Sequence, residues 1–332
     1  MKSYNKETKK KEFFLKKNIL FIAKSILKIL FIKRILFLLI YKFQKFFSKI
    51  NYKPLRGLVY DAVSEKQRLI ELQTKKEKLY IFSNDKNLSR DLFINNEFDL
   101  FKFKKVVEIL KNQNLKTLYD IGANIGVTCI PAIKRGYFEY AHAVEPESKN
   151  FNLLNKNVNL NNLDERISTY NFALSNSDDS YLEMELSEDN SGDHRIRPFN
   201  PQITIHDENK RNVTKVISKK FDTLFKNLNL KNDLVWIDAQ GYEPVILDGA
   251  ENLIKSKIPL VIEFWPYGLK RNKLWEKVDI FLKKYDYFID LSERQINKTQ
   301  INQKSLEELK NGWEEEKKNN HSLFTDLLLI KN

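Results

Sequence analysis

From residue 116 to the C-terminus, short apolar runs alternate with segments whose apolar residues recur at helical spacing. This alternation predicts an α/β fold, a mostly parallel sheet with helices on both faces. The runs that predict strands are residues 117–121, 141–144, 167–173, 234–237, 258–264, 287–291 and 323–330. A helix is expected to follow the first strand and its turn and to end near residue 135. Further helices are expected over residues 147–159, 243–254 and 272–284. Because ligands of such sheets bind beyond the carboxyl ends of the strands, we expect the functional residues at those ends.

The positive charge of the chain is concentrated at its N-terminus. The 332 residues carry a formal net charge of +13, and residues 1–57 contribute 16 Lys and Arg against 2 Glu. The remaining 41 basic and 42 acidic residues nearly cancel. A protein that grips a nucleic-acid backbone usually spreads basic charge over its folded surface, so we expect no nucleic-acid partner. Cys129 is the only cysteine and no Cys/His cluster has zinc-ligand spacing, so neither a disulfide within the chain nor a metal is expected.

Residues 17–50 predict a basic amphipathic helix. Neither Gly nor Pro interrupts them, and most of their lysines fall on one side of a helix while Ile, Leu and Phe fall on the other. The longest uncharged run, residues 35–41, is far shorter than a membrane span of about 20 residues. We therefore expect this helix to lie on an anionic membrane surface, with the protein cytoplasmic and peripheral to the inner face of the cytoplasmic membrane. A helix packed on the protein's own core is the alternative.

Three regions follow from these patterns. Residues 1–50 form the membrane-surface helix, residues 51–113 a helical linker region, and residues 114–332 the α/β domain. Within the linker region, residues 79–82 predict a short strand and residues 101–110 a helix.

A glycine-containing turn follows the first strand of the α/β domain. Its sequence is DIGANIG, residues 120–126. Gly122 allows a tight turn and a close approach of the backbone to a ligand, and Gly126 allows the following helix to pack on the sheet. The amino end of that helix offers unpaired N–H groups to a carboxylate or phosphate. By itself the pattern is weak evidence, because glycine turns are common.

Glu145 makes the pattern more specific. It ends the second strand, 23 residues after Gly122, where a carboxylate can accept hydrogen bonds from both ribose hydroxyls of an adenosine. A site for a nicotinamide dinucleotide usually has a second glycine at the position of Asn124. In addition, Asp120 would repel the pyrophosphate of that cofactor. A carboxylate at Asp120 can instead interact with the cationic amine of methionine. The residues therefore favour S-adenosylmethionine as the cofactor. The alternative is that the cofactor is NAD and the protein an oxidoreductase.

Five segments, taken in order, resemble the FkbM family of methyltransferases. They are DIGANIG, AVEPESKNFNLLNKNVNLNN, FALSNSD, VWIDAQGYEPVILDGAENLI and LVIEFWP, and the similarity extends over about residues 95–330. An ordered set of five motifs is far more specific than one glycine turn. The resemblance implies the Rossmann-like fold of class I methyltransferases, with a seven-stranded sheet whose last strand is antiparallel.

The same resemblance implies which residues hold S-adenosylmethionine. They form the turn, then the ribose site, then the border of the adenine: Asp120, Gly122, Ala123, Asn124 and Gly126; Glu145 and Pro146; Phe172 and Ala173. Gln240 departs from the family, which commonly has an acidic residue before the glycine at position 241. A role that requires a charge at position 240 is therefore not expected.

Asp238 is the first candidate for a catalytic residue. It ends the strand beside the cofactor strand, and a carboxylate near the activated methyl group can accept the proton of a sugar hydroxyl. A structural acid is the alternative. Glu263 ends the following strand and is a candidate for binding the acceptor, whereas Glu243 is expected to cap the helix that it begins.

His194 is the third catalytic candidate. It lies in SGDHRIRP, a loop-rich insertion before the Asp238 strand that can form a lid over the site. Such a lid would supply His194 as a base and Arg195 or Arg197 as contacts for anions. An exposed histidine without a catalytic role is the alternative.

Together these features predict an S-adenosylmethionine-dependent O-methyltransferase. The family resemblance implies O-methylation, and the N-terminal helix would bring the enzyme to a lipid-linked substrate, so we expect a hydroxyl of a glycan or glycolipid as acceptor. Methylation of a lipid or a secondary metabolite stays open, as does a membrane-attached scaffold without activity. Intact Asp120, Gly122 and Glu145 argue against the scaffold.

Overall fold

The computed structural model of the chain describes residues 35, 38–39, 52–64, 67–198, 208–226, 232–256, 258–316 and 323–331. The chain divides into two compact units, residues 1–70 and 71–332. In the first unit, α4 (Lys53–Ser64) is a helix, and residues 35, 38 and 39 are helical. Apart from these three residues, the basic helix predicted over residues 17–50 lies outside the described residues. None of the helices in the described ranges combines the length and the apolar character that a membrane span requires.

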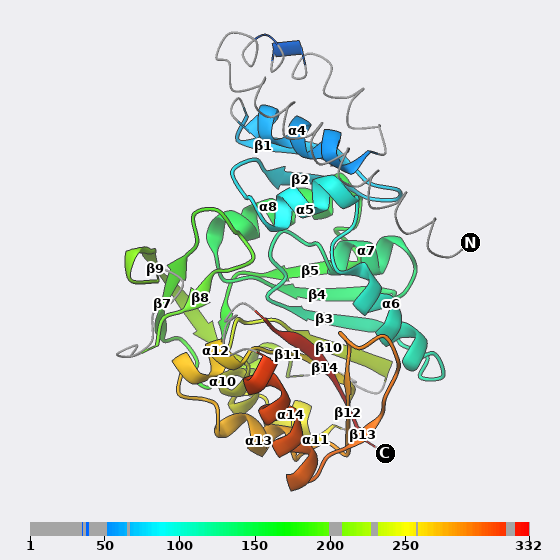
Figure 1. Cartoon of the computed structure of the whole chain (residues 1–332), viewed down its shortest axis with the longest axis vertical. Coiled ribbons are helices and arrows are strands. Elements are labelled where there is room, and N and C mark those ends of the chain that lie inside the picture. Colours follow the sequence, from blue (N-terminus) through cyan, green and yellow to red (C-terminus); the bar gives the residue numbers. More distant parts are fainter. Residues whose placement is uncertain are drawn as a thin grey trace, which may run out of the picture. The chain divides into compact units, whose positions relative to one another are not determined.

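The second unit is built on an eight-stranded sheet (Figure 1). Its strands lie in the order β13, β12, β14, β11, β10, β3, β4, β5. Their bounds are β3 (Thr117–Ile121), β4 (Tyr140–Val144), β5 (Ile167–Tyr170), β10 (Asp233–Ile237), β11 (Leu260–Phe264), β12 (Tyr287–Asp290), β13 (Thr299–Gln300) and β14 (Thr325–Ile330). The strands from β5 to β11 run parallel, and β14 is antiparallel to its neighbours β11 and β12.

This topology confirms the predicted α/β fold of a class I methyltransferase. The seven strands from β5 to β12 include the one antiparallel strand, β14, that the resemblance implies. The sheet differs from the expectation by one strand, because the two-residue strand β13 pairs with the free edge of β12.

Helices cover both faces of the sheet because successive side chains of a strand point to opposite faces. Val235 and Ile237 on β10 belong to a core cluster that includes residues of six helices. These are α9 (Phe221–Leu224), α10 (Glu243–Asp248), α11 (Glu251–Lys255), α12 (Pro266–Arg271), α13 (Lys277–Leu282) and α14 (Gln303–Glu316). Trp236, between the two, points to the other face, where its ring stacks on Phe103 of α6 (Leu100–Ile109) with centroids 5.9 Å apart. The carboxyl end of β10 is therefore fixed from both sides.

Three predicted elements differ from the structure. The strand predicted over residues 167–173 ends at Tyr170, where Asn171 turns the chain and donates its amide to the carbonyls of Glu145 and Pro146. The helix predicted over residues 243–254 is divided at Gly249, whose backbone runs so close to Ser175 that a Cβ would lie 2.1 Å from the carbonyl oxygen. The helix predicted over residues 272–284 occupies only α13, and α12 (Pro266–Arg271) precedes it.

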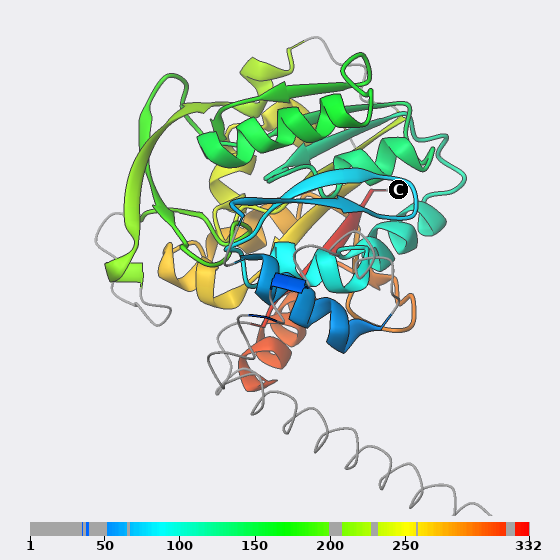
Figure 2. The same cartoon turned by 90° about the horizontal axis from the view of Figure 1, so that it is seen from above.

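The region between β5 and β10 contains a second sheet where the sequence suggested only a loop-rich insertion. Its strands are β6 (Ala173–Leu174), β7 (Tyr181–Leu186), β8 (Arg195–Ile196) and β9 (Asn212–Lys219), in the order β6, β9, β7, β8. Figure 2 shows β7 and β9 as a curved ribbon at the side of the main sheet. The connection between β7 and β8 contains His194.

The segment before β3 contains the strand and the helix that the sequence predicts there. A two-stranded sheet pairs β1 (Leu69–Gln73) with β2 (Lys78–Phe82), and α5 (Leu88–Asn95) follows it. The strand predicted over residues 79–82 corresponds to β2, and the helix predicted over residues 101–110 corresponds to α6.

Candidate active site

A cavity of about 630 Å³ opens at the carboxyl ends of β3, β4, β10 and β11. This volume lies in the usual range for small-molecule sites. Ten of the twelve predicted site residues line the cavity: Asp120, Gly122, Asn124, Glu145, Pro146, Phe172, Ala173, His194, Asp238 and Glu263. The structure thus brings together residues that are as much as 143 positions apart in the sequence, from Asp120 to Glu263.

The other two predicted residues, Ala123 and Gly126, support the turn from outside the cavity lining. The N–H of Ala123 donates to the carbonyl oxygen of Val144 at 3.0 Å. At Gly126, φ is +89°, and a Cβ would lie 2.6 Å from Cδ1 of Ile130 and 2.9 Å from Cδ1 of Leu154. The helix that was expected to begin near Gly126 begins at Cys129, as α7 (Cys129–Lys134). The turn is therefore longer than the sequence suggested.

Gly122 lies where β3 meets the neighbouring strand end. Its φ is +88°, and a Cβ at this position would lie 2.0 Å from the carbonyl oxygen of Asp238. No L-residue fits there without moving the backbone. The close approach of these two backbone segments therefore places the cofactor turn directly against Asp238, the first catalytic candidate.

Asp120 closes the turn with its side chain. Its Oδ2 accepts a hydrogen bond from the N–H of Cys129 at 3.0 Å. Burial, with a smaller contribution from the nearby charge of Asp238, raises the pKa of Asp120 to about 7. Asp120 lines the cavity, as the expected contact with a methionine amine requires, and a cation placed there would favour its ionised form.

Glu145 is held in place by two backbone donors. Its Oε2 accepts from the N–H of Asn124 at 2.9 Å, and its Oε1 accepts from the N–H of Glu147 at 2.8 Å. Each carboxylate oxygen can accept a second hydrogen bond, so both ribose hydroxyls of an adenosine can still bind. Desolvation raises the pKa of Glu145 to about 8, with smaller contributions from the acids nearby.

Asp238 faces the cavity at the end of β10. Its side chain is reached by water, and its Oδ1 accepts a hydrogen bond from Nε2 of Gln240 at 2.9 Å. Desolvation by the surrounding protein, together with the nearby charge of Asp326, still raises the pKa of this carboxyl group to about 6. Lys102 and the Gln240 hydrogen bond act in the opposite direction.

Glu263 lies on the strand beside that of Asp238 and is more deeply buried. It is only 2 % exposed, its Oε1 accepts from the same Gln240 nitrogen at 3.1 Å, and no described residue bonds its Oε2. Desolvation raises the pKa of Glu263 well above its usual range, and the charge of Asp238 raises it further. Gln240 therefore uses one amide nitrogen to join two carboxyl groups. An acidic residue at position 240, as the family commonly has before this glycine, would instead place three carboxyl groups together. Gln240 avoids the repulsion that their negative charges would cause.

Glu243 has a structural role, but not the predicted one, because it holds the turn before α10 and does not cap the helix that it begins. Its Oε1 accepts from the N–H groups of Ala239 and Gly241, the turn that precedes α10. Burial raises its pKa to about 8. This carboxyl group holds the turn that carries Gln240, whose φ of +54° is uncommon for a residue with a Cβ.

His194 is present at the cavity, but its geometry favours a donor over a base. Its Nδ1 accepts a hydrogen bond from the N–H of Ser187 at 3.1 Å. Burial lowers its pKa, so the neutral ring is favoured and carries its proton on Nε2. The histidine therefore has an N–H, rather than a lone pair, to offer a substrate.

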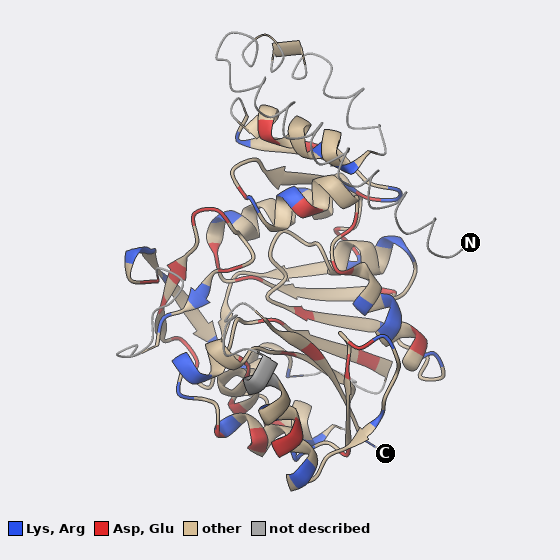
Figure 3. Ribbon diagram, viewed as in Figure 1, with Lys and Arg blue, Asp and Glu red and all other residues tan. Residues whose placement is uncertain are grey.

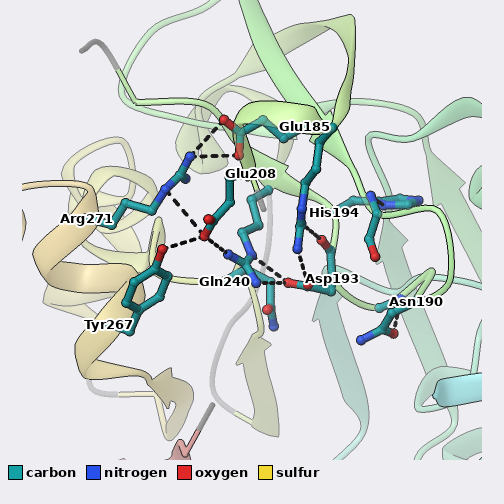
Figure 4. Close-up of polar contacts among 12 residues, drawn as sticks. Glu185, Asn190, Asp193, His194, Glu208, Gln240, Tyr267 and Arg271 are labelled. Carbon is teal, nitrogen blue, oxygen red and sulfur yellow. Dashed lines mark hydrogen bonds and ion pairs between the residues drawn. The ribbon is translucent and has the colours of Figure 1, made fainter. Parts of the chain in front are cut away.

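The arginines near His194 belong to a buried network of ion pairs that the sequence did not reveal (Figure 4). Arg195 is paired with Asp193 and with Glu208, which also accepts from the hydroxyl of Tyr267 at 2.5 Å. The remaining pairs join Arg211 to Asp193 and Arg271 to Glu185 and Glu208. Arg195 is thus already committed to carboxylates, which argues against its expected role as an anion contact.

Asp326 is a cavity residue that the sequence analysis missed. It lies on β14, opposite Glu263 of β11, and its Oδ2 is 2.7 Å from Nζ of Lys102. Because β14 is antiparallel, the start of this strand reaches the edge where the parallel strands end. The sequence could have indicated Asp326, because the family resemblance implies that the last strand is antiparallel and therefore begins at this edge.

The charges of the cavity favour a cationic cofactor. Figure 3 shows Lys and Arg interspersed with Asp and Glu along the described ribbon in that view. In contrast, the ionisable lining residues are mostly acids, whose ionised forms a bound cation would favour: Asp91, Asp99, Asp120, Glu145, Asp193, Asp238, Glu263 and Asp326. Arg195 is the one Lys or Arg among the described lining residues. S-adenosylmethionine carries a sulfonium and an ammonium against one carboxylate and suits this lining, whereas the pyrophosphate of NAD would be repelled.

The Glu145 assignment leads to a direct test. Glu145→Ala is expected to weaken the binding of S-adenosylhomocysteine by about 1–3 kcal/mol, because charge-assisted hydrogen bonds to the ribose are lost. Titration calorimetry on the full chain measures this change. Glu165→Ala, at an exposed acid after α8 (Ser148–Leu160), is the matched control. An affinity that Glu145→Ala leaves unchanged would refute the ribose role.

Comparisons with known proteins agree with this site. The family model described as the methyltransferase FkbM domain matches residues 120–289, about half of the chain. No curated protein matches the sequence.

Several solved structures are similar at low sequence identity. The methyltransferase FkbM from Methylobacillus flagellatus is 16 % identical with a TM-score of 0.35, over 52 % of this chain and 39 % of that one. The METTL16 methyltransferase domain is 10 % identical with a TM-score of 0.42, over 85 % of this chain and 81 % of that one. TrmK from M. capricolum, solved with S-adenosylhomocysteine, is 15 % identical with a TM-score of 0.36, over 70 % and 68 % of the two chains. The match to the first of these structures thus spans well under half of that protein.

The family model covers the cofactor turn, the ribose carboxylate and the Asp238 strand end together. The chain therefore belongs to the FkbM family of S-adenosylmethionine-dependent methyltransferases.

Proposed function

We propose that this methyltransferase transfers the methyl group to oxygen, on a hydroxyl of a glycan or glycolipid. The observation that carries the proposal is the Asp238 carboxylate, which faces the cavity beside the cofactor turn. A hydroxyl is a poor nucleophile until its proton begins to leave, so it needs a base at this place. A pKa of about 6 suits a base that works near neutral pH, since the group is mostly ionised there and still accepts a proton.

Different residues of the site bind the cofactor and accept the proton of the acceptor hydroxyl. S-adenosylmethionine, when bound, supplies a methyl group on a positively charged sulfur. Glu145 binds the ribose, and the absent side chain at Gly122 lets the cofactor turn lie directly against the backbone of Asp238. Asp238 would accept the hydroxyl proton on Oδ2 as the acceptor oxygen takes the methyl group and the methyl–sulfur bond breaks, leaving neutral S-adenosylhomocysteine, while Gln240 holds Oδ1. Glu263 orients Gln240, whose amide nitrogen also holds Asp238, so we assign Glu263 a positioning role.

Mass spectrometry of cell-envelope glycans tests the acceptor class. Glycans from cells that lack the gene are expected to be lighter by one methylene unit than those from cells that carry it. The lipid and small-molecule fractions of the same cells provide the comparison. A methyl group that is lost only from lipids or from a secondary metabolite would contradict the glycan proposal and favour the corresponding alternative.

We also propose that residues 17–50 attach the enzyme to the inner face of the cytoplasmic membrane. Support comes from the sequence, in which lysines share one side of the predicted helix and apolar residues the other. Deleting residues 1–50 is expected to move the protein from vesicles that contain anionic lipid to the supernatant in a sedimentation assay. Vesicles of neutral lipid are the control, because the lysines then lose their electrostatic partner. Continued sedimentation of the shortened chain with anionic vesicles would show that the attachment lies elsewhere.

A further inference from the structure

The connection between β7 and β8 reaches the cofactor turn. Ser191, near its middle, is 8 % exposed, and its carbonyl oxygen accepts from Nδ2 of Asn124 at 2.7 Å and from Nδ2 of Asn150 at 3.0 Å. The N–H of Asn124 in turn donates to Oε2 of Glu145. The connection is therefore two hydrogen bonds away from the carboxylate that we assign to the ribose.

Asp85 binds the same connection from the other side. Asp85 is 2 % exposed and follows β2, and its Oδ2 accepts from the N–H of Ser191 at 3.0 Å and from its Oγ at 2.5 Å. Its Oδ1 accepts from the N–H of Asn87 at 2.9 Å. Alongside, the N–H of Lys86 donates to the carbonyl oxygen of Asp189 at 2.8 Å. The N–H, carbonyl and hydroxyl of Ser191 are thus all bonded to buried groups.

The backbone at Gly192 allows this close packing. A Cβ there would lie 3.3 Å from Cδ1 of Leu88 and 3.8 Å from Nδ2 of Asn124. Residues 190–192 all line the cavity, and Figure 4 shows Asn190 and His194 on this connection. Side chains from three separate parts of the chain therefore fix a wall at the cofactor end of the cavity.

We propose that residues 190–192 form the outer wall of the cofactor site, and that Asp85 is the positioning residue that holds this wall closed. Asp85 contacts the wall but is not among the residues that line the cavity. Opening the wall separates the Ser191 N–H and hydroxyl from Asp85, so it loses both hydrogen bonds that hold the wall to this side chain. The wall therefore slows release of the cofactor. This inference goes beyond the proposed function, because it is independent of the acceptor.

Release of radiolabelled S-adenosylhomocysteine from the full chain, chased with unlabelled compound, tests the proposal. Asp85→Asn keeps the size of the side chain but replaces one acceptor oxygen with a donor, which then faces the N–H of either Ser191 or Asn87. We expect release to become about tenfold faster or more, with an unchanged association rate. Asp189→Asn is the matched control, since its side chain is exposed and makes only a solvent-exposed ion pair with Lys86.

A second variant covers the case in which Asp85→Asn does not fold. Ser191→Ala removes only the hydroxyl bond and is expected to accelerate release by a smaller factor. Release from a folded Asp85→Asn, or else from Ser191→Ala, at the rate of the unaltered chain would overturn the proposal. If the unaltered chain binds no S-adenosylhomocysteine, the methyltransferase role itself fails. Faster release combined with transfer to an acceptor other than a hydroxyl would overturn only the proposed function.

Discussion

Asp238→Asn is expected to lower kcat by about 10²–10⁴-fold, while the affinity for S-adenosylhomocysteine stays nearly the same. The amide matches the carboxylate in size, and its oxygen can still accept the hydrogen bond from Gln240. It cannot take up the acceptor proton, so the loss falls on the chemical step. Steady-state methyl transfer and calorimetric binding, measured on the same preparation, separate the two quantities.

The pH dependence of the unaltered enzyme supplies an independent check. Because Asp238 must be ionised to act as a base, kcat/KM is expected to fall as the pH is lowered through about 6. An ordinary aspartate would lose its charge at a lower pH. A profile that stays flat from pH 7 to pH 5 would contradict the role of Asp238.

Asp233→Asn is the matched control for Asp238→Asn. Asp233 begins the strand that Asp238 follows, and burial raises its pKa to about 6 as well. It does not line the cavity. We expect Asp233→Asn to leave kcat close to that of the unaltered chain. An equal loss of kcat in both variants would show that the Asp238 effect is structural.

Gly122→Ala is expected to destabilise the fold by about 4 kcal/mol or more and to abolish cofactor binding. A Cβ at Gly122 would lie 2.0 Å from the carbonyl oxygen of Asp238. Both residues directly follow buried strands, Gly122 after β3 and Asp238 after β10. Relief requires β3 and β10 to move apart, which also displaces the cofactor turn. Urea unfolding followed by circular dichroism measures the change in free energy.

Gly136→Ala separates the steric contact from the backbone conformation. Gly136 has φ of +76°, comparable to that of Gly122, but a Cβ there would meet no atom within 4 Å. We expect it to cost about 1–2 kcal/mol, the price of a left-handed conformation for an L-residue. Equal losses in the two variants would contradict the account of the close approach at Gly122.

Much of the fold could be predicted from the sequence because the central strands are continuous apolar runs. Residues 117–121 and 234–237 are buried on both faces and coincide with β3 and most of β10. The division at Gly249 could not be predicted, because it depends on the backbone of Ser175, more than 70 residues away. The sheet around β9 was missed for a similar reason, since half of β9 is exposed and its strand pattern is set by pairing with β7.

The cofactor half of the site was predictable, whereas the acceptor half was only partly so. Asp120, Gly122 and Glu145 lie within local motifs whose geometry follows from a strand, a turn and a strand end. Gln240 was noticed as a departure, but its bonds to Asp238 and Glu263 depend on the pairing of β10 with β11. The contact of Asp85 with Ser191 spans 106 positions and has no local signature.

A crystal structure of the full chain with S-adenosylhomocysteine tests the central claim most directly. It is expected to show the ribose hydroxyls within hydrogen-bond distance of the Glu145 carboxylate and the sulfur turned toward Asp238. A ligand bound elsewhere, or with its ribose away from Glu145, would contradict the assignment of this cavity as the methyl-transfer site.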